Sequence, residues 1–133
     1  MPAQDLASVK SVHLLAGDFN TPGAPMLQLS LGYNQANGTL NGEAVVTQAA
    51  AAPGAHVYMH HVYGTMNLLG EHTTQQVFIV KGLFYVPFGP PPLIGLRREK
   101  FSATFVTDPS WRGHCSFSYG NHTVDNVPVD QVK

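Results

Sequence analysis

The stretch that decides the fold is MLQLSLGYNQANGTLNGEAVVTQA, Met26 to Ala49, where two alternating apolar runs flank a short segment with two Asn-Gly pairs. In the first run Leu27, Leu29 and Leu31 fall on one side of a pleated strand, because successive side chains point to opposite faces. Asn-Gly readily adopts the positive φ that tight hairpin turns require. The stretch therefore predicts a β-hairpin with one buried face.

The rest of the chain continues this pattern. Alternating runs separated by turn signals recur over residues 8–19, 56–69, 74–86, 100–107 and 111–119, and no segment shows a convincing helical pattern. These runs predict an all-β protein, a single antiparallel β-sandwich or flattened barrel of about seven strands. We expect one domain over residues 1–133, with loose ends at about residues 1–7 and 121–133.

Three local features refine this prediction. The four apolar residues from Val77 to Val80 indicate a central strand that is buried on both faces. Gly64 indicates a β-bulge or a close approach of two backbones. The proline-rich segment 87–95 predicts a stiff loop, because proline donates no hydrogen bond to a sheet. The expected core includes Leu27, Leu29, Leu31, Val45, Val77, Ile79, Phe101, Phe105, Trp111 and Phe117.

The composition excludes several classes of function. Only 11% of the residues are charged and the formal net charge is −1, which argues against nucleic acid and anionic membranes as partners. No apolar run is long enough to span a bilayer, and the N-terminus lacks the basic start and apolar stretch of a secretory signal. We expect a cytoplasmic protein, with export by a signal-independent route left open. A single cysteine allows no intramolecular disulfide.

The seven histidines raise the question of a metal site. On a strand, His56 and His60 lie about 13 Å apart, too far to bind one ion. A cross-strand site that joins His60 or His61 to His114 or Cys115 stays open, and with it a metal-dependent hydrolase that uses histidines. Sensing of pH by several histidines near one sheet face is another open possibility. We expect solvated or hydrogen-bonded histidines instead, with no metal and no other cofactor.

Cys115 and Trp111 are the remaining candidates for chemistry. Cys115 shares a strand face with Trp111 and points away from the neighbouring histidine, so we expect a buried, inert thiol. Trp111 could form a carbohydrate platform with Tyr119, Asn121 and His122. Because Trp111 shares its face with other apolar residues, we expect it in the core instead.

The strand over residues 56–66 predicts an interaction surface, since it carries bulky side chains on both faces. A net charge near zero removes the repulsion that keeps copies of a protein apart. We therefore predict a binding or interaction module rather than an enzyme, with a homodimer or protein-partner contact at Tyr58, Val62 and Tyr63. The alternatives are a carbohydrate-binding module that uses Trp111 and the histidine-dependent hydrolase. A competing account covers both faces of the strand within the chain.

Three motifs resemble a family of short bacterial proteins that is described as a domain of unknown function. The family pattern L-x-L-S-L falls on Leu27 to Leu31, N-G-x-A-x-[IV]-T-Q-A on Asn41 to Ala49, and W-x-G-x-x-x-[FY]-S-Y on Trp111 to Tyr119. A proline-rich loop accompanies them, so the resemblance covers roughly residues 20–120. The family has no assigned activity, and the resemblance implies no catalytic residue in this chain.

Overall fold

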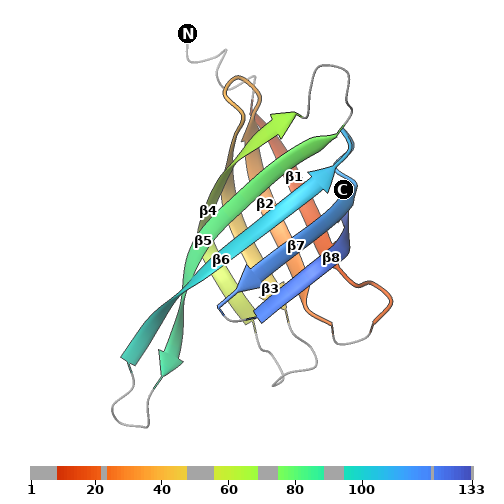
Figure 1. Ribbon diagram of the computed structural model, residues 1–133. Helices are drawn as coiled ribbons and strands as arrows, with labels where there is room; N and C mark the ends of the chain where they lie inside the picture. The colour runs from red at the N-terminus through yellow and green to blue at the C-terminus, as the bar shows by residue number, and fades with distance from the viewer. Residues whose placement is uncertain are drawn as a thin grey trace.

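The computed structural model describes residues 9–21, 24–47, 56–68, 75–88, 95–120 and 122–132, and these form a closed antiparallel barrel (Figure 1). The strands follow one another round the barrel in chain order: β1 (Val9–Gly17), β2 (Met26–Asn34), β3 (Thr39–Thr47), β4 (His56–Leu68), β5 (Gln76–Phe88), β6 (Gly95–Thr107), β7 (Gly113–Tyr119) and β8 (His122–Gln131). In the described part of the chain, no helix is long and apolar enough to cross a membrane. The predicted loose end at residues 1–7 lies outside the described residues.

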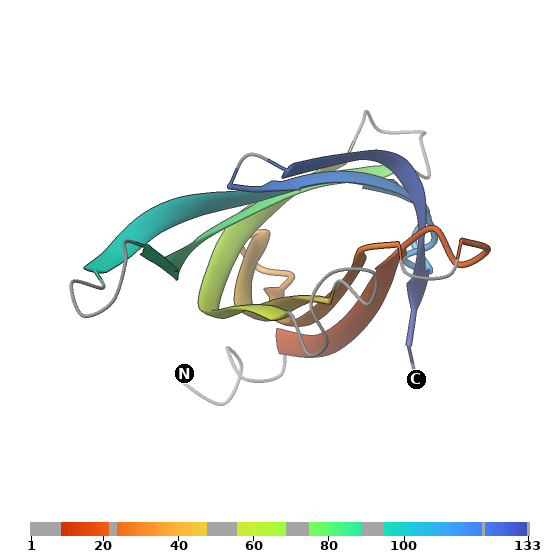
Figure 2. The same cartoon turned by 90° about the horizontal axis from the view of Figure 1, so that it is seen from below.

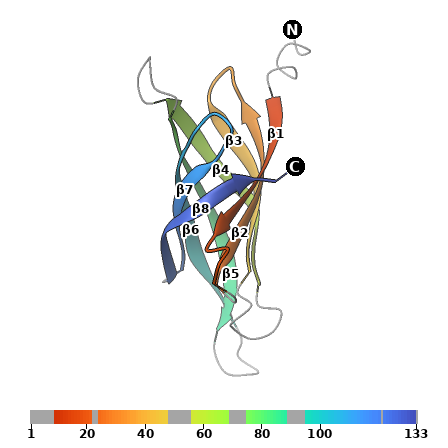
Figure 3. The same cartoon turned by 90° about the vertical axis from the view of Figure 1, so that its right-hand side faces the viewer.

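The barrel closes through β8, a strand in the segment that the sequence predicted to be a loose tail. The all-β class is confirmed, whereas the sandwich is wrong and the count of about seven strands becomes eight in a closed barrel. β8 pairs with β1 from Leu14↔Gln131 to Ala16↔Val129 (Figure 3). Closure pairs the first and last strands, which would otherwise present open edges to solvent.

A bulge hides β8 in the sequence. The register between β7 and β8 shifts between Cys115 and Phe117, and Asn126 of β8 has a positive φ of 52°. The backbone N–H of Asn126 donates to the Ser116 hydroxyl oxygen at 3.0 Å. Because the extra residue breaks the two-residue period, the buried valines of β8 do not stand out as an alternating run.

The decisive stretch forms the predicted hairpin of β2 and β3. The strands pair from Met26↔Thr47 to Asn34↔Thr39. In the turn, Gly38 has φ +73° and donates its N–H to the Asn34 carbonyl at 2.8 Å. The Asn37 side chain accepts the N–H of Thr39 at 3.1 Å. The turn therefore uses its asparagines as local acceptors and its glycine as the positive-φ residue.

Large apolar side chains fill the inside of the barrel. Phe78 and Phe105 stack there at a centroid distance of 4.6 Å. The predicted core positions Leu27, Leu29, Leu31, Phe101, Phe105, Trp111 and Phe117 are all buried. An eight-stranded barrel is just wide enough for side chains to occupy its interior, and here the described strands supply them.

Three predicted core residues are on the wrong face. Val45, Val77 and Ile79 point outward, and their neighbours Val46 and Phe78 point inward instead. Each error falls in a run of consecutive apolar residues, where the sequence does not show which alternate set is buried. β5 is therefore buried on one face, and the prediction that both of its faces are buried is wrong.

Gly64 confirms the prediction of a close backbone approach. A Cβ at this position would overlap the carbonyl oxygen of Ile79 on β5, so only glycine fits. The bulge itself lies earlier in β4, where the pairing moves from Ala44↔Met59 to Gly42↔Val62. The predicted bounds of the proline-rich loop are wrong at both ends, since β5 runs to Phe88 and so contains Pro87, and β6 begins at Gly95. Residues 89–94 of the predicted loop lie outside the described residues.

The turn between β6 and β7 places Trp111 against the core. The N–H of Trp111 donates to the Asp108 carbonyl at 2.9 Å, and Trp111 has φ +68°. The indole is 9% exposed and packs edge-on against Tyr33 and Phe78 at 5.6 and 5.3 Å. The Asp108 carboxylate accepts hydrogen bonds from the Ser110 hydroxyl and from the backbone N–H of Arg112. These bonds lower the pKa of Asp108, and the bond from Ser110 has the larger effect. Asp108 thus holds the turn in the shape that buries the tryptophan.

Candidate functional site

Four ring side chains project outward from one strand, β4. They are Tyr58, His60, His61 and Tyr63, which we call the ring row. The β4 bulge makes this possible, because His60 and His61 together lie opposite the single residue Glu43. A regular strand would have turned one of the two histidines inward.

The rings of the row contact one another in two pairs. Tyr58 lies 4.5 Å from His60, and Tyr63 lies 6.0 Å from His61, as measured between ring centroids. The Tyr58 hydroxyl donates to the Glu43 carboxylate, which raises the pKa of Tyr58. Tyr58 is 46% exposed and Tyr63 is 54% exposed. The row therefore presents aromatic surface to solvent, and a carboxylate fixes one of its ends.

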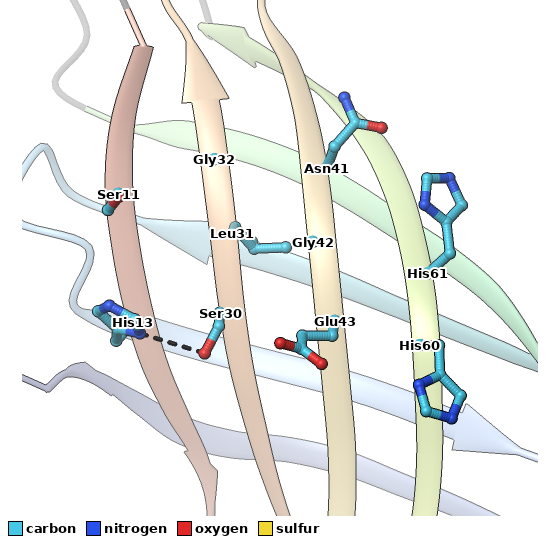
Figure 4. Close-up of a pocket in the computed structure, with 10 residues that line it drawn as sticks. All are labelled: Ser11, His13, Ser30, Leu31, Gly32, Asn41, Gly42, Glu43, His60 and His61. Carbon is cyan, nitrogen blue, oxygen red and sulfur yellow. Dashed lines mark hydrogen bonds between the residues drawn. The ribbon is translucent and has the colours of Figure 1, made fainter.

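A shallow hollow lies beside the ring row, across the outer faces of β1 to β4 (Figure 4). Its volume is about 540 Å³. Cross-strand pairing sets His13 next to Ser30 and Ser30 next to Glu43, and the His13 ring lies 3.1 Å from the Ser30 hydroxyl. The hollow thus offers hydrogen-bonding groups on one flank of the row, with His60 and His61 at its edge.

A second hollow, of about 490 Å³, is lined by residues of β3, β4 and β5 and extends past Tyr63 to the other flank of the row. Tyr63 pairs across the strands with Lys81, and Thr65 pairs with Ile79. Ile79 is exposed here, so this flank is more apolar than the first. Tyr63 lines this second hollow and stands between the two flanks of the row.

The structure separates the predicted site residues. Tyr58 and Tyr63 lie together on the outer face, whereas Val62 is fully buried in the barrel and out of reach of a partner there. Trp111 lies in a different region, packed into the core as expected. Tyr119 is buried as well, and Asn121 lies outside the described residues. The carbohydrate platform therefore has no exposed indole face to offer.

The histidines and the cysteine do not converge. β5 and β6 separate His60 and His61 on β4 from His114 on β7, a span of about 14 Å at the usual strand spacing. Among the described residues, no group of three His, Cys, Asp or Glu side chains is placed to hold a metal ion. Cys115 is buried inside the barrel, and this burial raises its pKa to about 12. Its thiol is therefore held in the unreactive, protonated form.

Sequence reasoning missed Glu43 and the joint role of His60 and His61. The signal was present, because two adjacent polar rings inside an alternating run cannot both face outward from a regular strand. The strand predicted over residues 56–66 is present as β4. Its bulge turns Val62 into the barrel, while Tyr58 and Tyr63 stay on the outside.

The fold and this surface define a small all-β barrel protein with a packed interior and a row of exposed rings on its wall. A family model matches residues 11–124, and the chain belongs to the family described as Domain of unknown function (DUF1842). The comparison with curated proteins finds no match.

Proposed function

We propose that this protein is a non-enzymatic interaction module that binds a second copy of itself through the outer face of β4. The observation that carries the proposal is the ring row, whose two tyrosines are about half exposed on either side of the β4 bulge. Tyrosine provides large, rigid contact area and is enriched where proteins meet. The inner face of β4, formed by Met59, Val62 and Met66, is buried in the core of the barrel. Only its outer face remains for a partner.

Charge and symmetry favour a second copy as the partner. A net charge of −1 gives little repulsion between copies. A two-fold contact sets the same patch against itself, so the apolar Tyr63 and Ile79 of one copy would meet their equivalents. The polar hollow with His13, Ser30 and Glu43 would then form part of the rim.

Two features of the barrel support a binding role over catalysis. The interior is occupied by side chains, so a ligand has to be met on the outside. The one thiol is protonated and buried. We therefore propose that the protein acts through its surface. We also propose that it does so in the cytoplasm.

Sedimentation velocity at micromolar concentration tests the proposal. We expect a dimer for the wild type and a weaker dimer for Tyr63→Ser, by about tenfold or more in dissociation constant. Tyr85→Ser is the matched control, because Tyr85 is also more than half exposed but lies on β5 beyond the β4 pairing. A wild type that stays monomeric, or equal loss in both variants, refutes the proposal.

A further inference from the structure

Two strands extend beyond the barrel wall as an arm. β5 pairs with β4 only as far as Gly82, and β6 pairs with β7 only from Phe101. Beyond these points β5 and β6 pair with each other alone, to Phe88↔Gly95. We call residues 83–88 and 95–100 the arm. It is about 20 Å long at ~3.3 Å per residue and projects away from the barrel (Figure 2).

One face of the arm is both apolar and cationic. The cross-strand pairs Leu83↔Lys100 and Tyr85↔Arg98 place these side chains together, and Leu96 follows on the same face. Tyr85 is 63% exposed and Leu96 is 69% exposed, the two highest values among the exposed large hydrophobic residues of the described chain. Such side chains in water are unfavourable unless a partner covers them.

The opposite face of the arm anchors it to the barrel. Phe84 is buried there, with its ring close to Gly120 of the turn between β7 and β8. Arg97 and Glu99 form an ion pair at 2.5 Å on this face. The arm therefore has a fixed root, and its exposed side chains are held in a set direction.

The charge of the arm differs from that of the chain. Four of the seven Lys and Arg residues, Lys81, Arg97, Arg98 and Lys100, lie on the arm or at its root. The single acid among them, Glu99, is already paired with Arg97. No charged residue occurs between Lys81 and Arg97 in the sequence. The net charge of the whole chain is near zero, but the arm carries a local cluster of cations next to exposed apolar side chains.

We propose that the arm docks on an anionic membrane surface. Tyr85 and Leu96 would enter the interface between headgroups and acyl chains, and Arg98 and Lys100 on the same face would contact the lipid phosphates. The charge of the arm is complementary to such a surface, and a projecting arm can reach a flat layer that the barrel wall cannot. Cytoplasmic leaflets carry a negative surface potential, which matches the location expected from the sequence.

This inference revises the expectation that anionic membranes are poor partners. That expectation rested on the net charge of the whole chain, whereas a membrane interacts mainly with charges within about 10 Å of its surface. Cations on strand edges also prevent copies from pairing edge to edge. That role does not require the exposed Tyr85 and Leu96 beside Arg98.

Co-sedimentation of the full chain with vesicles tests the proposal. We expect binding to vesicles of phosphatidylcholine mixed with phosphatidylglycerol, no binding to phosphatidylcholine alone, and weaker binding as salt is raised. Leu96→Ser should lower the affinity by about tenfold, and Arg98→Gln, on the same face of the arm, should lower it as well. The matched control is Val106→Ser, since Val106 is exposed on the part of β6 that belongs to the barrel wall.

The outcomes separate the partner classes. Failure of the wild type to bind the anionic vesicles overturns the proposal. Loss of binding in the arginine variant with full binding in Leu96→Ser also overturns it, because this shows adhesion to any polyanion without insertion. If a short single-stranded oligonucleotide competes with the vesicles for the protein, the partner is nucleic acid and the proposal is overturned. The self-association test measures the effect of a substitution at Tyr63 on β4, whereas the vesicle test measures the effect of substitutions in the arm. Either proposal can therefore fail while the other holds.

Discussion

Trp111 is the residue at which two opposed contributions to stability can be separated. It occupies the positive-φ position of a three-residue turn, where glycine is the usual residue. Its indole is nevertheless buried against Tyr33 and Phe78. The backbone strain and the side-chain packing therefore act on the free energy of unfolding with opposite signs. Substitution of Trp111 by alanine or by glycine removes the same indole, but the two variants differ in the backbone strain that remains at the positive φ.

The magnitudes follow from these two contributions. Loss of a buried tryptophan side chain lowers the free energy of unfolding by about 3 to 5 kcal/mol. A left-handed conformation costs a non-glycine residue about 1 kcal/mol, which Trp111→Ala retains and Trp111→Gly relieves. We expect Trp111→Gly to be more stable than Trp111→Ala by about 1 kcal/mol. This order is the reverse of that at an ordinary strand position, where glycine is the worse residue.

Urea unfolding followed by circular dichroism measures this difference. Thr104 on β6 provides the control, since it is exposed in a regular strand. Thr104→Gly should be less stable than Thr104→Ala by about 0.5 to 1 kcal/mol. If Trp111→Ala equals or exceeds Trp111→Gly in stability, the positive φ is not part of the folded turn and the reasoning is wrong.

Three further predictions concern other parts of the barrel. Gly64→Ala should lower the free energy of unfolding by about 1 to 3 kcal/mol, because the new methyl group overlaps the backbone of Ile79, whereas the methyl group of Gly32→Ala makes only ordinary van der Waals contacts; equal thermal shifts would contradict this. The pKa of Asp108 is lower in the folded protein than in the unfolded chain. Its carboxylate therefore stabilises the fold above the pKa of an unfolded Asp, about 3.9, and this stabilisation is lost as the pH falls through the pKa of the folded state. Asp108→Asn should therefore flatten the acid side of the curve of stability against pH, and an unchanged slope counts against the turn. Cys115, with its pKa raised to about 12, should not react with a thiol reagent at pH 8 until the protein is unfolded, and rapid labelling of the native protein would show that the thiol is accessible.

The sequence predicts the parts of the fold in which the two-residue period is uninterrupted. The hairpin of β2 and β3 has alternating leucines and Asn-Gly turn residues, so its register follows directly. The alternation in β6 and β7 likewise places Phe101, Phe105 and Phe117 inside the barrel. In these strands each local signal agrees with the global fold.

Bulges and consecutive apolar residues account for most of what the sequence does not predict. The bulge at His60 and His61 reverses the phase of β4, so Val62 moves inside while both histidines stay outside. The bulge at Asn126 hides the closing strand. Barrel closure joins residues more than a hundred positions apart along the chain, as in Leu14↔Gln131, and local periodicity carries no information about such pairs. The proline-rich segment favours a loop, which hides the arm, although an edge strand tolerates proline, as it does Pro87 in β5.

The central claim is that the outer face of β4 meets a second copy of the chain, and crosslinking tests it most directly. Thr65 of β4 and Thr123 of β8 are both exposed threonines, and their strands are separated by three others in each direction round the barrel. Each is changed to cysteine and treated with a short bismaleimide, while the buried Cys115 contributes no background. The account predicts a covalent dimer that forms rapidly for Thr65→Cys and slowly for Thr123→Cys. Equal rates for the two variants would contradict it.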